Sequence, residues 1–200
     1  MKFRIPMIFI STLVLFVVGV GLLDSMTSPN QEDPKPVTTP VSSKVGTTTK
    51  DYTSETFLMP VSKEIPLVRY FYEANSSTNQ EALDYFEGVY RQSEGIDYGQ
   101  EESFEVLASL SGTVSSVEKD SILGACVTID CENNLQLIYQ SLRNISVREG
   151  ESVAQGSLIG ESGHNIYEAE LGNHIHFTVL KDGNPINPLS VMNKQVKDIN

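Results

Sequence analysis

The sequence predicts a mainly β domain, built as an antiparallel sheet, a sandwich or a partly closed barrel with one short helix, behind a membrane anchor and a polar linker. Three observations predict this arrangement. An uncharged apolar run lies near the start, a stretch rich in Ser, Thr and Pro follows it, and many short apolar segments separated by turn residues come last. A chain of 200 residues has room for one ordinary domain besides these appendages.

Composition excludes several functional classes. The chain has 26 acidic and 14 basic side chains and a net charge of −12, which argues against nucleic-acid binding and against a polybasic contact with anionic lipids. Two cysteines and three histidines are too few for a disulfide scaffold or a four-cysteine zinc site. Tryptophan is absent, so a Trp-based aromatic platform is also excluded.

Residues 5–23 form an uncharged run of mainly Ile, Val, Leu and Phe. As a helix this run would be roughly 28 Å long, close to the thickness of a bilayer core. The alternative is a cleaved signal peptide, but Gly21-Leu22-Leu23-Asp24 stands where small residues in an A-x-A arrangement are expected. Because Lys2 and Arg4 precede the run, the positive-inside rule places residues 1–4 in the cytoplasm and the rest of the chain outside it.

Residues 24–65 are predicted to be a flexible extracytoplasmic linker, because Ser, Thr and Pro dominate and apolar side chains are sparse. A coil of this length reaches ~35 Å on average and holds the folded part away from the bilayer. We therefore expect one folded domain over residues 66–200.

Within that domain, the alternating segment Leu67–Tyr72 predicts a strand. A capping-box pattern at residues 78–81, followed by apolar residues at helical spacing, predicts a short amphipathic helix over Gln80–Tyr90. From residue 104 onward, short apolar runs alternate with turn residues, as in an all-β domain. The strands expected there are Phe104–Ala108, Thr113–Val117, Ala125–Ile129, Leu135–Tyr139, Ser157–Ile159 and His174–Leu180.

Cys126 and Cys131 flank the predicted strand Ala125–Ile129. In an extended chain these two residues lie ~17 Å apart on opposite faces. They therefore cannot form a disulfide with each other while the strand is straight. We expect both to be buried as small hydrophobic side chains.

The strongest chemical signal is the segment Gly172–Phe177, which contains His174 and His176. Histidines at i and i+2 on a strand project from the same face, which suits a zinc ligand beside a general base. Two satisfied surface histidines are an equally common explanation of this pattern. Two further segments of interest are Ser93–Asp97 and Leu137–Leu142.

In this order, these segments resemble the lysostaphin-type (LytM-like) zinc metallopeptidases, which cut peptidoglycan cross-bridges. The resemblance covers residues 92–189 and includes Leu110–Val114 and Asn187-Pro188. It implies a LytM-like β domain. Active members read H-x-G-x-D, Y-x-H-L and H-x-H at the three segments. The resemblance therefore implies that Asp97 and His176 match metal ligands and that His174 matches a catalytic base.

Two positions depart from the family pattern. Ser93 stands in place of a metal-ligand histidine, and Ser141 stands in place of a catalytic histidine. A serine hydroxyl is a far weaker zinc donor than imidazole, so two good ligands remain where a catalytic site needs three. Without zinc the pKa of water stays near ~15.7 instead of ~7. We therefore expect no bound zinc and no peptidase activity, with Asp97, His174 and His176 as vestiges of the site.

A closer resemblance is to sporulation-specific members of this family in endospore-forming bacilli, which combine one anchor helix, a polar linker and a β domain without the first ligand. It implies a single-pass forespore membrane protein that binds stage III sporulation protein AH on the facing mother-cell membrane. It also implies a ring or channel that supports engulfment and septal protein localisation. The alternatives are a zinc cell-wall endopeptidase in which Glu94 or His164 substitutes as a ligand, and a regulator that binds peptidoglycan without cutting it. The sequence identifies no partner-binding surface.

Overall fold

The computed structural model describes residues 50–200 of the chain. The predicted cytoplasmic N-terminus, the anchor helix over residues 5–23 and the first part of the predicted linker lie outside the described residues. Among the helices within residues 50–200, none has the length and apolar character needed to cross a membrane.

The described chain is a mainly β fold with very little helix, as the sequence predicts. Its helical elements are single turns: η1 (Asn79–Ala82), η2 (Ala169–Leu171), α1 (Pro188–Val191) and η3 (Val196–Asp198). Its strands are β1 (Leu67–Arg69), β2 (Leu83–Phe86), β3 (Val89–Gln92), β4 (Ile96–Gln100), β5 (Glu105–Leu107), β6 (Gly112–Asp120), β7 (Gly124–Cys131), β8 (Leu135–Arg143), β9 (Ser152–Val153), β10 (Leu158–Ser162), β11 (Asn173–Lys181) and β12 (Asn184–Ile186).

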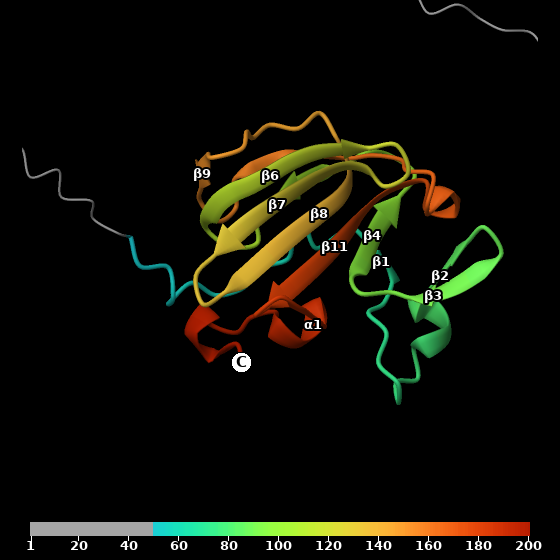
Figure 1. Ribbon diagram of the computed structural model, residues 1–200, viewed down its shortest axis with the longest axis horizontal. Coiled ribbons are helices and arrows are strands. Elements are labelled where there is room, and N and C mark those ends of the chain that lie inside the picture. The colour runs from blue at the N-terminus through green and yellow to red at the C-terminus, as the bar shows by residue number, and fades with distance from the viewer. Residues whose placement is uncertain (1–49) are drawn as a thin grey trace, which may run out of the picture. The chain divides into compact units, whose positions relative to one another are not determined.

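One antiparallel sheet contains all the strands except β2 and β3. Its main path runs β1-β4-β11-β8-β7-β6-β9, while β10 pairs with β5 and β8, and β12 pairs with β11. Figure 1 shows the long strands β6, β7, β8 and β11 side by side, with the β2–β3 hairpin beyond β1 and β4. The sheet thus brings β4, from the first half of the domain, against β11, from its end.

The core is centred on aromatic side chains of β8 and β11. Tyr139 lies directly opposite Phe177 in the β8–β11 register, and their ring centroids are 5.0 Å apart. Phe57 packs on Phe177 at 6.3 Å, and all three side chains are fully buried. The Tyr139 hydroxyl accepts a hydrogen bond from the Ser109 backbone N–H at 2.9 Å. Because its polar end is satisfied, this tyrosine can be buried at little cost.

The folded part begins earlier than the sequence predicts. Phe57 and Val61, assigned to the linker over residues 24–65, are core side chains. The Phe57 N–H donates to the Lys194 carbonyl at 2.8 Å, and Thr56 forms a β-bridge with Gln195. The predicted boundary was wrong because it rested on the average composition of the polar stretch. That average does not reveal single apolar side chains that pack against the C-terminal segment.

The helix predicted over Gln80–Tyr90 is wrong, because β2 and β3 form a hairpin there. Tyr85 lies opposite Tyr90 in this hairpin, with ring centroids 4.8 Å apart. Glu87 and Gly88 both have positive φ, at 49° and 81°, as a two-residue turn of type I′ requires. The apolar residues of this segment fit the periodicity of a helix as well as that of a strand. The Glu-Gly turn favours the hairpin.

The other predicted strands are confirmed, with boundaries shifted by a few residues. The strand expected over Leu67–Tyr72 ends at Arg69, and β4, β9 and β12 were not predicted. Cys126 and Cys131 are free thiols on β7, as expected, although both are half-buried instead of fully buried. Burial raises the pKa of Cys126 to about 11 and that of Cys131 to about 12.

Candidate functional site

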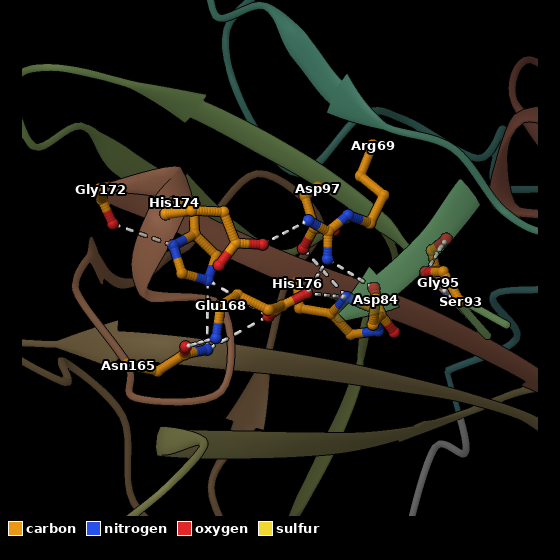
Figure 2. A network of polar contacts seen from close by, with 11 residues as sticks. Arg69, Asp84, Ser93, Gly95, Asp97, Asn165, Glu168, Gly172, His174 and His176 are labelled. Atoms are coloured by element: carbon orange, nitrogen blue, oxygen red, sulfur yellow. Dashed lines mark hydrogen bonds and ion pairs between the residues drawn. The ribbon is translucent and has the colours of Figure 1, made fainter. Parts of the chain in front are cut away.

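The residues singled out by the sequence meet where β4 pairs with β11. In this antiparallel register His176 lies opposite Asp97 and His174 lies opposite Gly99. Since side chains two residues apart on a strand share a face, both imidazoles lie on the side of the sheet that Asp97 also occupies (Figure 2). Asp97 and His174 are fully buried, and His176 is 9% exposed.

His176 and Asp97 form a buried pair. His176 Nδ1 lies 2.9 Å from Asp97 Oδ1. Burial alone would lower the pKa of His176, but the charge of Asp97 and its hydrogen bond outweigh this effect and raise the pKa to about 9. Burial raises the pKa of Asp97 above its usual range. Because the negative charge of Asp97 is the main cause that raises the pKa of His176, we describe the pair as an imidazolium that donates a hydrogen bond to a carboxylate.

His174 has polar partners for both ring nitrogens. Its Nδ1 is 2.9 Å from the Gly172 carbonyl oxygen, and its Nε2 is 3.3 Å from Glu168 Oε2. Burial lowers the pKa of His174, but the hydrogen bond to Glu168 more than compensates and raises it above its ordinary value. The imidazole is thus held in place by groups on the loop that precedes β11.

Glu168 joins the two histidines, and sequence reasoning missed it. Burial would raise its pKa, but the hydrogen bond from His174 and the charge of His176 lower it to about 2. Asn165 fixes the loop around it, because the Asn165 Oδ1 accepts from the Glu168 N–H at 2.6 Å. The Asn165 Nδ2 also donates to Glu168 Oε2 at 3.2 Å.

Arg69 is a second functional side chain that sequence reasoning missed. Its guanidinium is buried among carboxylates, with Nη1 at 2.5 Å from Asp84 Oδ1 and 3.1 Å from Glu168 Oε1. Its Nη2 lies 2.8 Å from Glu170 Oε1. The sequence held one indication of this role, because Arg69 is a charged residue inside a segment that alternates like a strand. No local pattern marked the acidic residues of the loop.

Ser93 forms a local contact at the edge of this network. The side chain is 1% exposed, and its hydroxyl donates to the Gly95 carbonyl at 3.2 Å. Gly95 in turn packs against His176, since a Cβ at this position would lie 2.5 Å from His176 Nε2. The backbone therefore approaches the imidazole closely, and the serine hydroxyl is satisfied by its own loop.

Ser141 is linked to His174 through the backbone of Gly163. The Ser141 carbonyl accepts from the Gly163 N–H at 2.7 Å, and the Gly163 carbonyl accepts from the His174 N–H at 3.0 Å. Ser141 is fully buried with φ of 63°, and its hydroxyl has no hydrogen-bond partner among the described residues. The structure therefore gathers Ser93, Asp97, Ser141, His174 and His176 in one region of the sheet.

Comparison with known proteins identifies the family. Residues 91–188 match the profile of Peptidase family M23. A chain of the structure described as the SpoIIQ-SpoIIIAH pore forming complex shares 41% identity and a TM-score of 0.69, covering 72% of this chain and 94% of that chain. The chain belongs to peptidase family M23.

Two further proteins are similar to this chain. Stage II sporulation protein Q of Bacillus subtilis (strain 168) is 41% identical over 151 residues, which is 72% of this chain. The chain spans 53% of the length of that relative. A zinc-containing peptidase from Vibrio cholerae shares the fold, with 22% identity and a TM-score of 0.57 over 68% of this chain and 40% of that chain.

Asp97 and His176, which the family resemblance assigns to the metal, do not fit a zinc ion in this arrangement. Two ligand atoms on a tetrahedral zinc lie about 3.4 Å apart, whereas the Asp97 and His176 atoms are already joined by a hydrogen bond of 2.9 Å. Asp97, Glu168 and His174 offer another set of donor atoms within 4.8 Å of one another. However, the Arg69 guanidinium already contacts Glu168 and lies next to Asp97.

A cleft of about 640 Å³ opens beside the network. Most of its lining residues carry polar or charged groups, and they include His176, Glu168 and Gln140. Glu94, one of the two candidate substitute ligands, is an exposed residue of this lining. His164, the other candidate, is exposed and is absent from the donor set within residues 50–200.

Proposed function

We propose that this chain is a catalytically inactive member of family M23 that binds stage III sporulation protein AH. The supporting observation is its similarity to a chain of the SpoIIQ-SpoIIIAH complex, at 41% identity over 94% of that chain. Similarity at this level over almost a whole chain favours conservation of the surface as well as of the core. In this proposal the M23 fold acts as a binding module.

The proposed inactivity rests on the two serines. With Ser93 in place of a ligand histidine, Asp97 and His176 are the remaining metal donors, fewer than the three that a catalytic zinc requires. With Ser141 in place of a catalytic histidine, proton transfer that typically contributes ~10² to 10⁴ in rate is also lost. The buried hydroxyl of Ser141 has no polar partner among the described residues, so it has no proton acceptor in reach.

The proposal includes a membrane topology. Residues 5–23 would anchor the chain in the forespore membrane with residues 1–4 in the cytoplasm, and the β domain would lie in the space between forespore and mother cell. Since Phe57 belongs to the core, the linker is shorter than composition predicts. A coil of roughly 30 residues still reaches ~30 Å, enough to meet a partner on the facing membrane. A ring or channel built with that partner would support engulfment and septal protein localisation.

A zinc-dependent cell-wall endopeptidase is the competing function. It is favoured by the donor atoms of Asp97, Glu168 and His174, which lie within 4.8 Å of one another. Carboxylate and imidazole donors of this kind occur in catalytic zinc sites. The cleft beside them leaves room for a peptidoglycan fragment, either as a substrate or as a ligand that is bound without being cut.

The test uses the full chain in detergent micelles. We would mix it with the outer domain of stage III sporulation protein AH and measure the mass of any complex by size-exclusion chromatography with light scattering. In parallel, purified cell walls would be incubated with the wild type and with Asp97→Asn as a matched control. We expect a complex at micromolar concentration and no wall cleavage by either protein. Absence of association would refute the binding function, whereas cleavage by the wild type alone would favour the peptidase.

A further inference from the structure

The Arg69 guanidinium and the two imidazoles share the same carboxylates. Glu168 contacts Arg69 through Oε1 and His174 through Oε2. Asp97 contacts His176 through Oδ1, while its Oδ2 lies 3.8 Å from Arg69 Nε. That Oδ2 is buried and has no hydrogen bond among the described residues. The guanidinium is thus the positive charge that faces the second oxygen of Asp97, between this carboxylate and Glu168 (Figure 2).

We propose that the guanidinium of Arg69 is the cation of this site and balances the charge of Asp97 and Glu168 in place of a metal ion. As a built-in cation it holds Asp97 and Glu168 in position around the histidines and keeps a divalent ion out. Arginine suits this role because its planar group carries a permanent charge and five N–H donors that match carboxylate oxygens. The inference does not depend on the binding of stage III sporulation protein AH.

The sheet explains how Arg69 reaches this position. β1 pairs with β4 so that Arg69 lies opposite Asp97, and the register shifts between Leu67 and Arg69. Asp84 on the β2–β3 hairpin and Glu168 on the loop before β11 then approach from other segments. One guanidinium therefore connects β1, β4, the hairpin and the loop, much as a structural metal connects its ligands.

Burial makes this cation necessary for the fold. Arg69 is 7% exposed, and Asp84, Asp97 and Glu168 are each at most 5% exposed. A buried carboxylate is costly unless a cation or hydrogen-bond donors compensate for its lost hydration. Burial would lower the pKa of Arg69, but its hydrogen bond to Glu170 and the charge of Asp97 raise it above its ordinary value. The guanidinium therefore stays charged at neutral pH.

Removal of the guanidinium should expose a latent metal site. Asp97, Glu168 and His174 would keep their donor atoms within 4.8 Å of one another and lose the positive charge beside them. Carboxylate oxygen and imidazole nitrogen are both zinc donors. The variant Arg69→Met keeps most of the aliphatic volume and removes the charge, so it tests this reasoning directly.

The experiment compares wild type, Arg69→Met and Arg69→Lys as full chains in detergent, with and without ZnCl₂. Thermal unfolding and zinc content after gel filtration are the two measurements. We expect wild type to hold less than ~0.1 zinc per chain and to show no zinc-dependent change in Tm. Arg69→Met should lose about 10 °C in Tm without zinc. With about 100 µM zinc it should bind roughly one ion per chain and recover at least half of that loss.

Arg143→Met is the matched control, because Arg143 forms an exposed ion pair with Glu161 at 3.2 Å. This variant should change neither Tm nor zinc content, as is usual for exposed pairs. The inference is overturned if wild type binds stoichiometric zinc, or if Arg69→Met is as stable as wild type and zinc-free. If Arg69→Met does not fold, Arg69→Lys decides. A folded, zinc-free lysine variant supports the built-in cation, whereas zinc uptake or loss of folding in that variant contradicts it.

Discussion

A change in pH from 6.0 to 8.0 perturbs the buried pair of His176 and Asp97, and we expect the protein to lose stability over this range. His176 Nδ1 lies 2.9 Å from Asp97 and 3.7 Å from Glu168. Asp84 and Arg69 are the other charged groups packed around this pair. The carboxylates outweigh the effect of burial and raise the pKa of His176 to about 9.

The sign and size of the effect follow from linkage. A group whose pKa is higher in the folded state than in the unfolded state stabilises the fold while it is protonated. For His176 this contribution is complete below the ordinary pKa of ~6.5 and is lost as the pH rises through about 9. Between pH 6.0 and 8.0 the free energy of unfolding should fall by about 2 kcal/mol, and Tm by ~4–8 °C. His174, whose pKa is also raised, adds a loss in the same direction.

Urea unfolding of the full chain in detergent at pH 6.0, 7.0 and 8.0 measures this loss. The pH range stays below the ordinary pKa of cysteine, ~8.5, so the two thiols contribute little. His176→Gln is the control, since it removes the titrating imidazole and keeps a polar side chain of similar size. We expect a shallower pH dependence in this variant. A free energy of unfolding that stays constant or rises with pH, or an equal slope in the variant, would refute the reasoning.

Three further predictions concern the stability of the site and of the core beside it. Ser141→Gly should raise the free energy of unfolding by about 1 kcal/mol, because Ser141 has φ of 63° and a buried hydroxyl without a partner among the described residues. A lower free energy of unfolding in urea would contradict this. Tyr139→Phe should cost about 1–3 kcal/mol, because the Ser109 N–H loses its buried acceptor; an unchanged urea midpoint would count against that bond. Gly95→Ala should cost about 2 kcal/mol or more, because its Cβ would lie 2.5 Å from His176 Nε2; a wild-type Tm would show that the backbone yields.

The β architecture could be predicted from the sequence because its strands alternate short apolar runs with turn residues. The segment Ala125–Ile129, for example, lies within β7, and His174–Leu180 lies within β11. The pairing of the strands could not be predicted from the sequence pattern, because the contact of β4 with β11 joins residues about 80 positions apart along the chain. The family resemblance predicted that Asp97 and His176 lie close together. The periodicity of the sequence alone does not predict this contact.

Two local predictions failed for physical reasons. The apolar residues of β2 and β3 fit a helix as well as a hairpin, and the positive φ of Glu87 and Gly88 decided between them. The burial of Phe57 depends on contacts with the C-terminal segment near Lys194, which composition cannot reveal. The first error reflects local turn chemistry that favours a hairpin, and the second reflects tertiary contacts that override a local preference.

The site was predicted only in part. Motif comparison identified the two serines and the retained Asp97, His174 and His176. It did not identify the charged side chains that balance them. Arg69 reaches the site through β-sheet pairing, and Glu168 reaches it from an irregular loop. Neither residue belongs to a recognisable spacing pattern, so their convergence required the three-dimensional structure.

The central claim is that the Arg69 guanidinium balances the buried carboxylates of this site in place of a metal ion, and NMR of the arginine side chains tests it most directly. In the ¹⁵N-labelled full chain, spectra of wild type and Arg69→Met would assign the Arg69 guanidinium signals. We predict separate, slowly exchanging Nη–H signals for Arg69, held by Asp84, Glu168 and Glu170, and no change when excess zinc is added. A rapidly exchanging, averaged signal, or one displaced by stoichiometric zinc, would contradict the claim.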